Sequence, residues 1–291
     1  MNFELSEEQR MIQQSVERFV EDNYDLNSRV ALSSKSPGFS TENWHSMAEL
    51  GWLGLPFEEE DGGFGGNQID VLVVMEQFGR GLVLEPYLAS IVMGGGALKR
   101  GGTDALKSEI LPQVIEGTLQ LAFAYAEEQS RFDLDDVMTS ARKEGENFVL
   151  NGQKSMVQNA ETADKIVVSA RTSSGQVSPQ GITLFLIDAD AEGLSRDNFP
   201  TVDGLRASEI TLENVSVGPD RILGEVDQGF SILQSVANDA MLALSAEAVG
   251  AMEVLYKDTV DYTQQREQFD HPLSEFQVLQ HRMVDMFMEY E

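Results

Sequence analysis

The spacing of apolar residues changes twice along these 291 residues, and this change constrains the fold more than any single motif. Up to about Gly117, apolar side chains recur every three or four positions, as in LSEEQRMIQQSVERFVEDN, which indicates amphipathic helices. Between residues 118 and 228 the repeat shortens to two and turn-forming residues recur, which indicates strands. From Gly229 the helical repeat returns. We therefore predict an α+β protein with an N-terminal helical domain at residues 1–117, a middle β domain at residues 118–228 and the beginning of a C-terminal helical bundle at residues 229–291.

The middle region predicts a mainly antiparallel sheet, folded as a barrel or a sandwich. No long helical segment separates its apolar runs, whereas parallel strands are usually joined by helical crossovers. Residues Gly145–Asn147 are expected to turn between two strands. The dipeptide Asn151-Gly152, which follows soon after, is typical of a further hairpin.

The helical regions contain local start and stop signals. Ser6 is expected to cap the first helix, and Ser40 or Thr41 to cap another that Gly51 ends. Two glycine-rich segments, DGGFGGNQ and GGGALKRGG, are expected to be loops. The first lacks the Gly-Lys-Ser/Thr ending of a phosphate loop and does not match GxGxxG between a strand and a helix.

The C-terminal region predicts a long helix followed by a shorter one. The segment Phe230–Arg266 contains no proline, and its middle, Ala240–Met252, is apolar nearly all round, which predicts a helix buried among other helices. After Pro272 a second helix gathers apolar residues on one face, namely Phe276, Leu279, Met283, Met286, Phe287 and Tyr290. No capping residue precedes Glu291, so we expect either a longer chain or another subunit to complete the bundle.

Composition narrows the classes of function. Twenty Lys and Arg against 49 Asp and Glu give a net charge of −29, which disfavours nucleic acid and anionic membranes as partners. There is no cysteine, and His45, His271 and His281 are far apart, so we expect no metal site. The polar N-terminus is not a secretory signal, and no apolar run is long enough to span a membrane. We expect a cytoplasmic protein.

Catalytic groups are hard to find from residue types alone. There is no GxSxG motif and no histidine near a candidate serine, so acid–base chemistry would need a carboxylate. Asp239 and Glu247 are the only acids between Ala237 and Met252. Each is either paired, at an interface, or a base with a raised pKa, and a structural role is favoured for both.

The order of the three regions and their wording resemble the acyl-CoA dehydrogenases, flavoenzymes that oxidise an acyl-CoA thioester to the trans-2-enoyl thioester. The matching stretches are LGWLGLPFEEEDGGFGGNQIDVLVVMEQFGRGL, GENFVLNGQKSMVQNAETADKIVVSAR and QREQFDHPLSEFQVLQH, in the family's order. LAFAYAEEQSRFDL and SAEAVGAM are similar to pimeloyl-CoA dehydrogenase small subunits and steroid side-chain dehydrogenases, several of which work as heteromeric pairs.

The resemblance implies FAD as cofactor and assigns the turn after the long helix to it. In the family this turn crosses a subunit interface and holds the adenosine-diphosphate half of FAD bound mainly by the neighbour. Arg266, Phe269 and Gln277 occupy the positions of the family's Arg, Phe and Gln. A guanidinium pairs with pyrophosphate oxygens, a phenyl ring packs an edge of the cofactor, and an amide both donates and accepts hydrogen bonds.

The chain also departs from the family pattern. Where many members carry Thr-Glu-Pro followed by a run ending in Ser-Asp, this chain has Ala126-Glu127-Glu128 and Phe132-Asp133, so the two hydroxyls are absent. Glu127 is kept as a predicted cofactor contact. Met156 and Gln158 replace a Trp and a Thr that face the flavin, and both are predicted to contact it.

The catalytic glutamate of the family has no counterpart at the expected place on the long helix. Ala240 and Met241 stand where some members carry Glu and Arg, so we expect the base beyond Glu291 and predict that neither Asp239 nor Glu247 serves. The resemblance further implies electron-transfer flavoprotein as partner and a homotetramer, or a heterotetramer with a related subunit. Two alternatives stay open: half of a heteromeric enzyme, and a non-catalytic binding or scaffolding relative.

Overall fold

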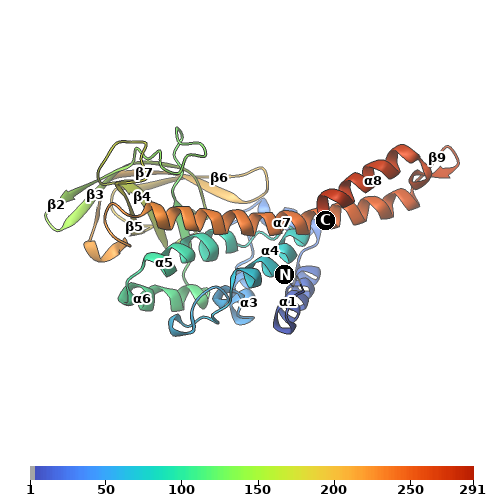
Figure 1. Cartoon of the computed structure of the whole chain (residues 1–291), viewed down its shortest axis with the longest axis horizontal. Helices are drawn as coiled ribbons and strands as arrows, with labels where there is room; N and C mark the ends of the chain where they lie inside the picture. Colours follow the sequence, from blue (N-terminus) through green and yellow to red (C-terminus); the bar gives the residue numbers. More distant parts are fainter. Residues whose placement is uncertain (1–3) are drawn as a thin grey trace. The chain divides into compact units, whose positions relative to one another are not determined.

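The computed structural model describes residues 4–291 and has helices, then strands, then helices along the chain, which confirms the predicted fold class (Figure 1). The first helices are α1 (Glu7–Asn23), α2 (Leu26–Ser33), α3 (Thr41–Glu49), α4 (Gln68–Gly81), the π-helix Tyr87–Gly95, α5 (Gly96–Gly101) and α6 (Asp104–Ile115). Two short 3-10 turns, Trp52–Gly54 and Glu59–Asp61, lie between α3 and α4.

The predicted caps of the first helices are confirmed. The Ser6 hydroxyl accepts a hydrogen bond from the Gln9 amide at 3.1 Å, and the Gln9 side chain accepts one from the Ser6 amide at 3.0 Å. This reciprocal pair satisfies two amides that the helix itself leaves free. At α3 the Ser40 hydroxyl accepts a single capping hydrogen bond, from the Asn43 amide at 3.1 Å. Gly51 follows α3 with φ 82°, a left-handed conformation that ends the helix.

The two glycine-rich segments have different structures. DGGFGGNQ connects the turn Glu59–Asp61 to α4 as a loop, as predicted. The prediction of a loop for GGGALKRGG is wrong, because this segment runs through the π-helix and α5. A Cβ added to Gly94 would lie 2.5 Å from the Cβ of Leu121, and one added to Gly95 would lie 2.6 Å from the Phe57 ring. These glycines therefore permit close packing inside a helix.

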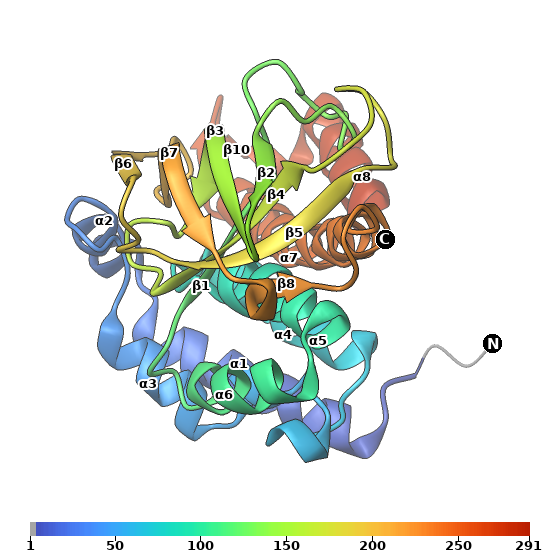
Figure 2. The same cartoon turned by 90° about the vertical axis from the view of Figure 1, so that its left-hand side faces the viewer.

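Strands β6, β7, β3, β2, β4, β5 and β8 lie in that order in an eight-stranded sheet, and β1 pairs with β4 (Figure 2). Their bounds are β1 (Leu121–Ala124), β2 (Ser140–Glu144), β3 (Asn147–Gln158), β4 (Lys165–Arg171), β5 (Ile182–Asp188), β6 (Leu194–Pro200), β7 (Arg206–Val217) and β8 (Ile222–Leu223). Most pairings are antiparallel, as predicted, while the parallel pairings of β4 with β1 and with β2 make the sheet mixed.

The hairpin expected at Asn151-Gly152 is wrong. Both residues lie inside β3, and the turn between β2 and β3 is at the predicted Gly145 instead. A Cβ on Gly152 would lie 2.6 Å from the Cα of Thr139, so glycine is needed here for a close approach of two chain segments. One face of the sheet carries the core of the β region, in which the rings of Phe148 and Phe185 lie 5.3 Å apart.

The C-terminal region contains α7 (Phe230–Gln265), the short strands β9 (Glu267–Gln268) and β10 (His271–Pro272), and α8 (Gln277–Tyr290). The apolar face predicted for α8 packs on α7, where the Tyr256 ring lies 5.6 Å from the rings of Phe287 and Tyr290. The middle of α7, Ala240–Met252, predicted to be buried among other helices, is not covered all round by the described residues. Met241, Leu242 and Leu244 are between 47% and 58% exposed.

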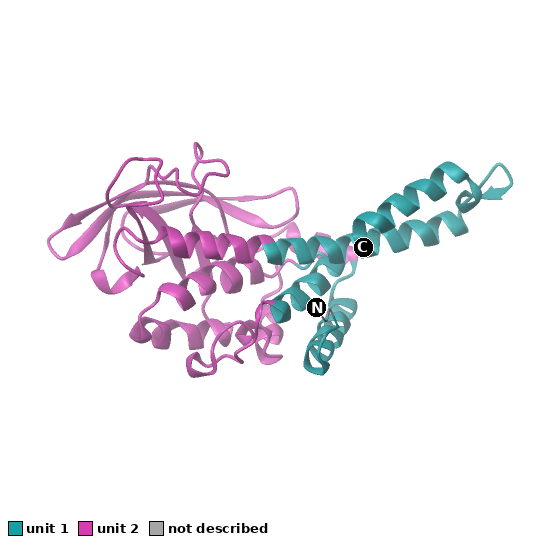
Figure 3. Cartoon of the chain, viewed as in Figure 1, with its two compact units in different colours: residues 1–25, 69–83, 242–291 teal, residues 26–68, 84–241 magenta. Residues whose placement is uncertain are grey.

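Two compact units divide the described chain (Figure 3). One comprises residues 1–25, 69–83 and 242–291, and the other residues 26–68 and 84–241. In the first unit α4 and α7 meet at two glycines: a Cβ on Gly79 would lie 1.9 Å from the Glu247 carbonyl oxygen, and one on Gly250 1.8 Å from that of Glu76. Within residues 4–291, no helix combines the length and the hydropathy that a bilayer crossing requires.

Candidate functional site

A β-bulge in β3 determines which side chains leave the core near the predicted flavin contacts. Lys154 pairs with Ile210 and Val157 with Ser208, so Ser155 and Met156 together face the single residue Glu209 on β7. The extra residue reverses the alternation of the strand. Lys154 and Val157 are buried, whereas Met156 is 55% exposed and Gln158 is half-buried. Both predicted flavin contacts thus point away from the core.

Neighbouring segments fix the bulge by three hydrogen bonds. The Ser155 amide donates to the Ala126 carbonyl at 2.9 Å. The Ser155 hydroxyl donates to Oε2 of Glu209 at 2.8 Å, and the Met156 amide donates to Oε1 of Glu209 at 3.2 Å. Met156 has φ 54°, a left-handed conformation that costs energy in a residue with a side chain. The bulge is therefore held from both sides.

Next to the bulge, on the core side of the sheet, Lys154 and Glu127 form a buried ion pair. The Lys154 ammonium, fully buried, donates to Oε1 of Glu127 at 2.8 Å and to the Ser169 hydroxyl at 2.9 Å. The Glu127 carboxylate also accepts hydrogen bonds from the Met138 amide at 2.7 Å and the Thr139 amide at 3.0 Å. This network ties the segment after β1 to β2 and β3.

Burial and the attraction between the opposite charges shift the pKa values of these two residues in opposite directions. Burial raises the pKa of Glu127, but the Lys154 ammonium and the hydrogen bonds outweigh it and hold the pKa at about 2. Burial lowers the pKa of Lys154 to about 8 against the attraction of Glu127. Since its oxygens are engaged by protein donors, Glu127 supports the bulge from behind. Its contact with a cofactor stays a prediction.

The turn between α7 and α8 carries the other three predicted residues. Strands β9 and β10 form a hairpin whose two central residues, Phe269 and Asp270, have φ of 56° and 64°. Phe269 is 85% exposed, with its ring 6.3 Å from that of Phe276. Arg266 and Gln277 are also exposed, and Arg266 makes no ion pair with any residue in the range 4–291. The hairpin thus presents a cation, a ring and an amide to the surroundings.

The six predicted cofactor residues fall into two groups. Glu127, Met156 and Gln158 lie in the unit of residues 26–68 and 84–241. Arg266, Phe269 and Gln277 lie in the other unit. Within the first group the structure brings the residues together through the bulge and the ion pair behind it, and within the second group they share one turn and the helix start that follows.

Asp239, one of the two carboxylates considered as a base, is paired. Its side chain forms an ion pair with Arg100 of α5, one of the alternatives expected for it, while its role stays a prediction. Glu247 is half-buried on α7, where its carbonyl oxygen faces Gly79. Among residues 4–291, no group of three or more His, Cys, Asp or Glu side chains is placed to hold a metal ion.

Two acidic residues of interest escaped the sequence analysis. Glu85 is buried, and burial raises its pKa to about 7 although the Ser40 amide donates to it at 3.2 Å. A single acid inside the apolar run LVLEPYL is the signal that marks it. Glu209 looks like any solvent-facing acid of a strand, and only the pairing of β7 with the bulge distinguishes it.

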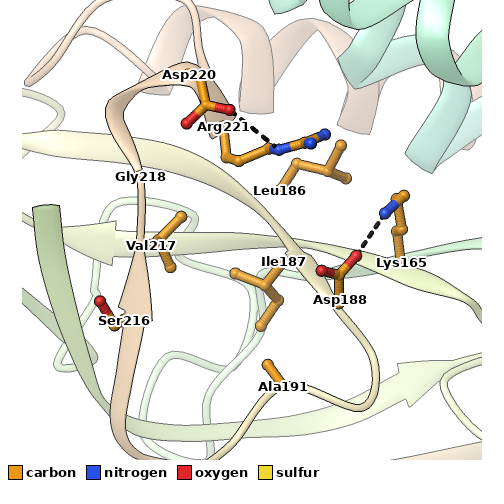
Figure 4. Close-up of a pocket in the computed structure, with 10 residues that line it drawn as sticks. All are labelled: Lys165, Leu186, Ile187, Asp188, Ala191, Ser216, Val217, Gly218, Asp220 and Arg221. Atoms are coloured by element: carbon orange, nitrogen blue, oxygen red, sulfur yellow. Dashed lines mark hydrogen bonds and ion pairs between the residues drawn. The ribbon is translucent and has the colours of Figure 1, made fainter.

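A cavity of about 250 Å³ opens beside β5, and none of the predicted site residues lines it (Figure 4). It is lined by Lys165, Leu186, Ile187, Asp188, Ala191, Ser216, Val217, Gly218, Asp220 and Arg221. Its two cations are already paired, Lys165 with Asp188, and Arg221 with Asp220 at 3.4 Å and with Glu109 at 2.9 Å. The cavity therefore offers no unpaired cation for an anionic ligand.

Comparison with known proteins covers almost the whole chain. The N-terminal, middle and C-terminal domain models of acyl-CoA dehydrogenases match residues 6–118, 122–215 and 227–291. The chain is 30% identical to the probable acyl-CoA dehydrogenase YngJ of Bacillus subtilis, over all of this chain and 77% of YngJ. It is 28% identical to CarC, a subunit of the caffeyl-CoA reductase–Etf complex of Acetobacterium woodii, over 99% of this chain and 76% of CarC. The FAD complex of PigA superimposes with a TM-score of 0.91 at 26% identity, covering all of this chain and 77% of PigA.

Proposed function

The chain belongs to the acyl-CoA dehydrogenase family, FAD-dependent oxidoreductases that act on CH–CH bonds, and on this premise we propose its specific reaction. It oxidises an acyl-CoA thioester to the trans-2-enoyl thioester and passes the electrons to an electron-transfer flavoprotein. The subunit CarC, named as part of a complex with Etf, supports the choice of electron acceptor. We propose a fatty acyl chain or a steroid side chain as the acyl group.

The observation that carries this proposal is the bulge in β3. It turns Met156 and Gln158 out of the core and supports them from behind with the ion pair of Lys154 and Glu127. An apolar side chain beside an amide fits an aromatic ring system with polar edges, so the residues present fit a flavin. FAD, when bound, would supply the acceptor for the hydride from Cβ of the substrate. Met156 would pack against its ring, and Gln158 would hydrogen-bond the ring edge.

Arg266, Phe269 and Gln277 are proposed to hold the adenosine-diphosphate half of FAD bound mainly by another subunit. The exposed guanidinium of Arg266, without an ion pair in residues 4–291, fits a pyrophosphate. In a chain with a net charge of −29, an unpaired arginine at the surface is a specific attraction for an anion. We accordingly propose a homotetramer, or a heterotetramer with a related subunit, in the cytoplasm.

A carboxylate must remove the α-proton of the substrate, and we propose that Asp239 and Glu247 do not do so. The Asp239 carboxylate forms an ion pair with Arg100. Glu247 lies two turns along α7 from Ala240, about 10 Å along the axis. We propose that the base comes from a segment beyond Glu291.

We also propose domain limits at residues 1–117, 118–228 and 229–291, which the extents of the three family matches support.

A second function, half of a heteromeric enzyme, is favoured by a specific observation. Ala126 and Phe132 stand where the family places a Thr and a Ser hydroxyl toward the flavin, and Phe132 is 97% exposed. A subunit that has lost these hydroxyls suits an assembly in which a partner provides the base or part of the flavin site. A purely scaffolding relative is the third possibility.

The colour and mass of the purified protein separate these functions. A yellow homotetramer with acyl-CoA dehydrogenase activity supports the first proposal. A colourless protein that becomes yellow only when mixed with a related subunit supports the second. If no pairing gives bound flavin, both enzymatic proposals fail and the scaffolding role stands.

A further inference from the structure

We propose that Glu209 is a positioning residue, which holds the bulge of β3 so that Met156 and Gln158 meet the flavin. This inference rests on the proposed function, because it takes the flavin to lie against these two side chains. Glu209 itself is not assigned a contact with cofactor or substrate. It acts through the backbone of the two residues opposite it.

The register of the sheet explains why a bulge is needed. Lys154 points into the core, so an unbroken strand would also turn Met156 and Gln158 inward and Val157 outward. The structure has the opposite arrangement: Val157 is 2% exposed and belongs to the core, whereas Met156 is 55% exposed. The bulge thus determines whether the predicted flavin contacts face the cofactor or the interior.

Glu209 satisfies the groups that the bulge leaves without partners. A bulge disrupts the ladder locally and leaves an amide unpaired. The Met156 amide donates a hydrogen bond to Oε1 of Glu209 at 3.2 Å, and the Ser155 hydroxyl donates one to Oε2 at 2.8 Å. Both carboxylate oxygens are used, one for each bulged residue. Hydrogen bonds to a charged acceptor are the stronger kind, and here they favour the left-handed conformation of Met156, with φ 54°.

The same sheet contains a second bulge built in the same way. Between Leu150 and Gly152 the register shifts so that Glu213 and Asn214 of β7 face Asn151 of β3. Asn214 has φ 57°, and its amide donates to the side-chain oxygen of Asn151 at 2.9 Å. In both bulges the side chain opposite accepts from the amide of the left-handed residue. None of the predicted site residues belongs to the second bulge, which therefore serves as a control.

The experiment compares flavin binding among variants of the full chain purified with FAD and with any subunit it requires. The dissociation constant and the visible spectrum of the bound flavin are measured for Glu209→Ala, Glu209→Gln, the double variant Met156→Ala/Gln158→Ala, and the triple variant that combines it with Glu209→Ala. Two controls on the same strands are Glu213→Ala, whose exposed side chain has no partner in residues 4–291, and Asn151→Ala at the second bulge.

Glu209→Ala is expected to weaken flavin binding about tenfold and to shift the flavin absorbance bands, the size of a lost charged hydrogen bond. Glu209→Gln is expected to stay within about threefold of the parent, since its amide still offers an acceptor to Met156 and a donor to Ser155. In the Met156→Ala/Gln158→Ala background, Glu209→Ala should add less than about twofold, because the side chains that it positions are gone. Both controls should leave binding and spectrum unchanged.

Failure of this inference is distinguishable from failure of the proposed function. If Met156→Ala/Gln158→Ala weakens flavin binding but Glu209→Ala does not, the positioning role is overturned and the flavin site stands. If the double variant itself binds flavin unchanged, the flavin site is misplaced and both ideas fall. Should Glu209→Ala not fold, Ser155→Ala removes one of the two bonds, with about a threefold weakening expected; no change would overturn the inference.

Discussion

The bulge of β3 and the hairpin after α7 carry the two groups of predicted cofactor residues, yet their polar groups are satisfied in opposite ways. Around the bulge, Lys154, Glu127 and Glu209 each bind protein groups at 2.7–3.2 Å. At the hairpin, Arg266 has no ion pair in residues 4–291, and Phe269 is 85% exposed. The first region is organised by its own chain before any ligand arrives. The second is suited to gain its partners from outside the chain.

The largest effect on stability is expected when the ammonium of Lys154, which pairs with Glu127 next to the bulge, is removed. Lys154→Met leaves the Glu127 carboxylate buried without its counter-charge, so we expect a loss of about 3–5 kcal/mol in the free energy of unfolding, measured with urea by circular dichroism. Lys165→Met is the matched control, because Lys165 pairs with Asp188, which is 61% exposed. We expect this control to lose about 1 kcal/mol or less. Equal losses in the two variants would mean that the buried pair does not organise the region.

Acid is expected to weaken the same region by a somewhat smaller amount. The pKa of Glu127 is lowered from 4.5 to about 2, so the native protein holds fewer protons than the unfolded chain in this interval. The stabilisation is therefore present above about pH 4.5 and is lost as the pH falls toward 2, a change of about 3 kcal/mol.

Urea unfolding at a series of pH values between 5 and 2.5 measures this loss. Glu127→Gln should flatten the decline in the free energy of unfolding, whereas Glu213→Gln, at an exposed position, should leave it as in the parent protein. A decline that persists in Glu127→Gln would assign the acid sensitivity to other carboxylates.

The hairpin should respond to mutation through ligand binding and not through stability. Arg266→Ala removes a guanidinium that has no ion pair in residues 4–291, so the free energy of unfolding should not change. FAD retention should weaken by about 2–3 kcal/mol, the size of a charge-assisted bidentate contact, while the oligomer persists. Flavin occupancy after extensive dialysis and the mass in solution measure the two effects.

Arg282→Ala is the control for this prediction, since Arg282 is another exposed arginine of the same unit without an ion pair in the described residues. It should retain FAD fully. If Arg266→Ala also keeps its flavin through dialysis, Arg266 is not part of the site and the hairpin has another partner.

Sequence reasoning succeeded where the physical cause is local. The cap at Ser6 depends on residues within one helical turn, and the face of α8 on a repeat within one segment. It failed where distant segments decide the outcome. Asn151-Gly152 has the composition of a turn, but the close approach of Thr139 explains the glycine.

The same distinction, between local causes and contacts of distant segments, applies to the candidate site. Arg266, Phe269 and Gln277 fall within twelve residues, and the resemblance of this one local stretch to the family pattern predicted them. The support for Met156 comes from Glu209, 53 residues away, and from the pair of Lys154 with Glu127, 27 residues apart. No local sequence pattern predicts such contacts, because they depend on the register of β3 against β7 and on how the segment after β1 packs on the sheet.

The smallest effects are expected at the two acids of α7, and they extend the comparison to catalysis. Asp239 resembles the bulge residues, because Arg100 already binds its carboxylate, and we predict that it takes no proton from a substrate. Glu247 lies two turns beyond Ala240, about 10 Å along the helix axis. Asp239→Asn and Glu247→Gln should each keep most of the exchange of the α-proton on a bound acyl-CoA, measured by deuterium incorporation with flavin occupancy as the control. A loss of several orders of magnitude in either variant, with flavin still bound, would place the base in this helix and would show that a carboxylate held by its own chain can still serve in catalysis.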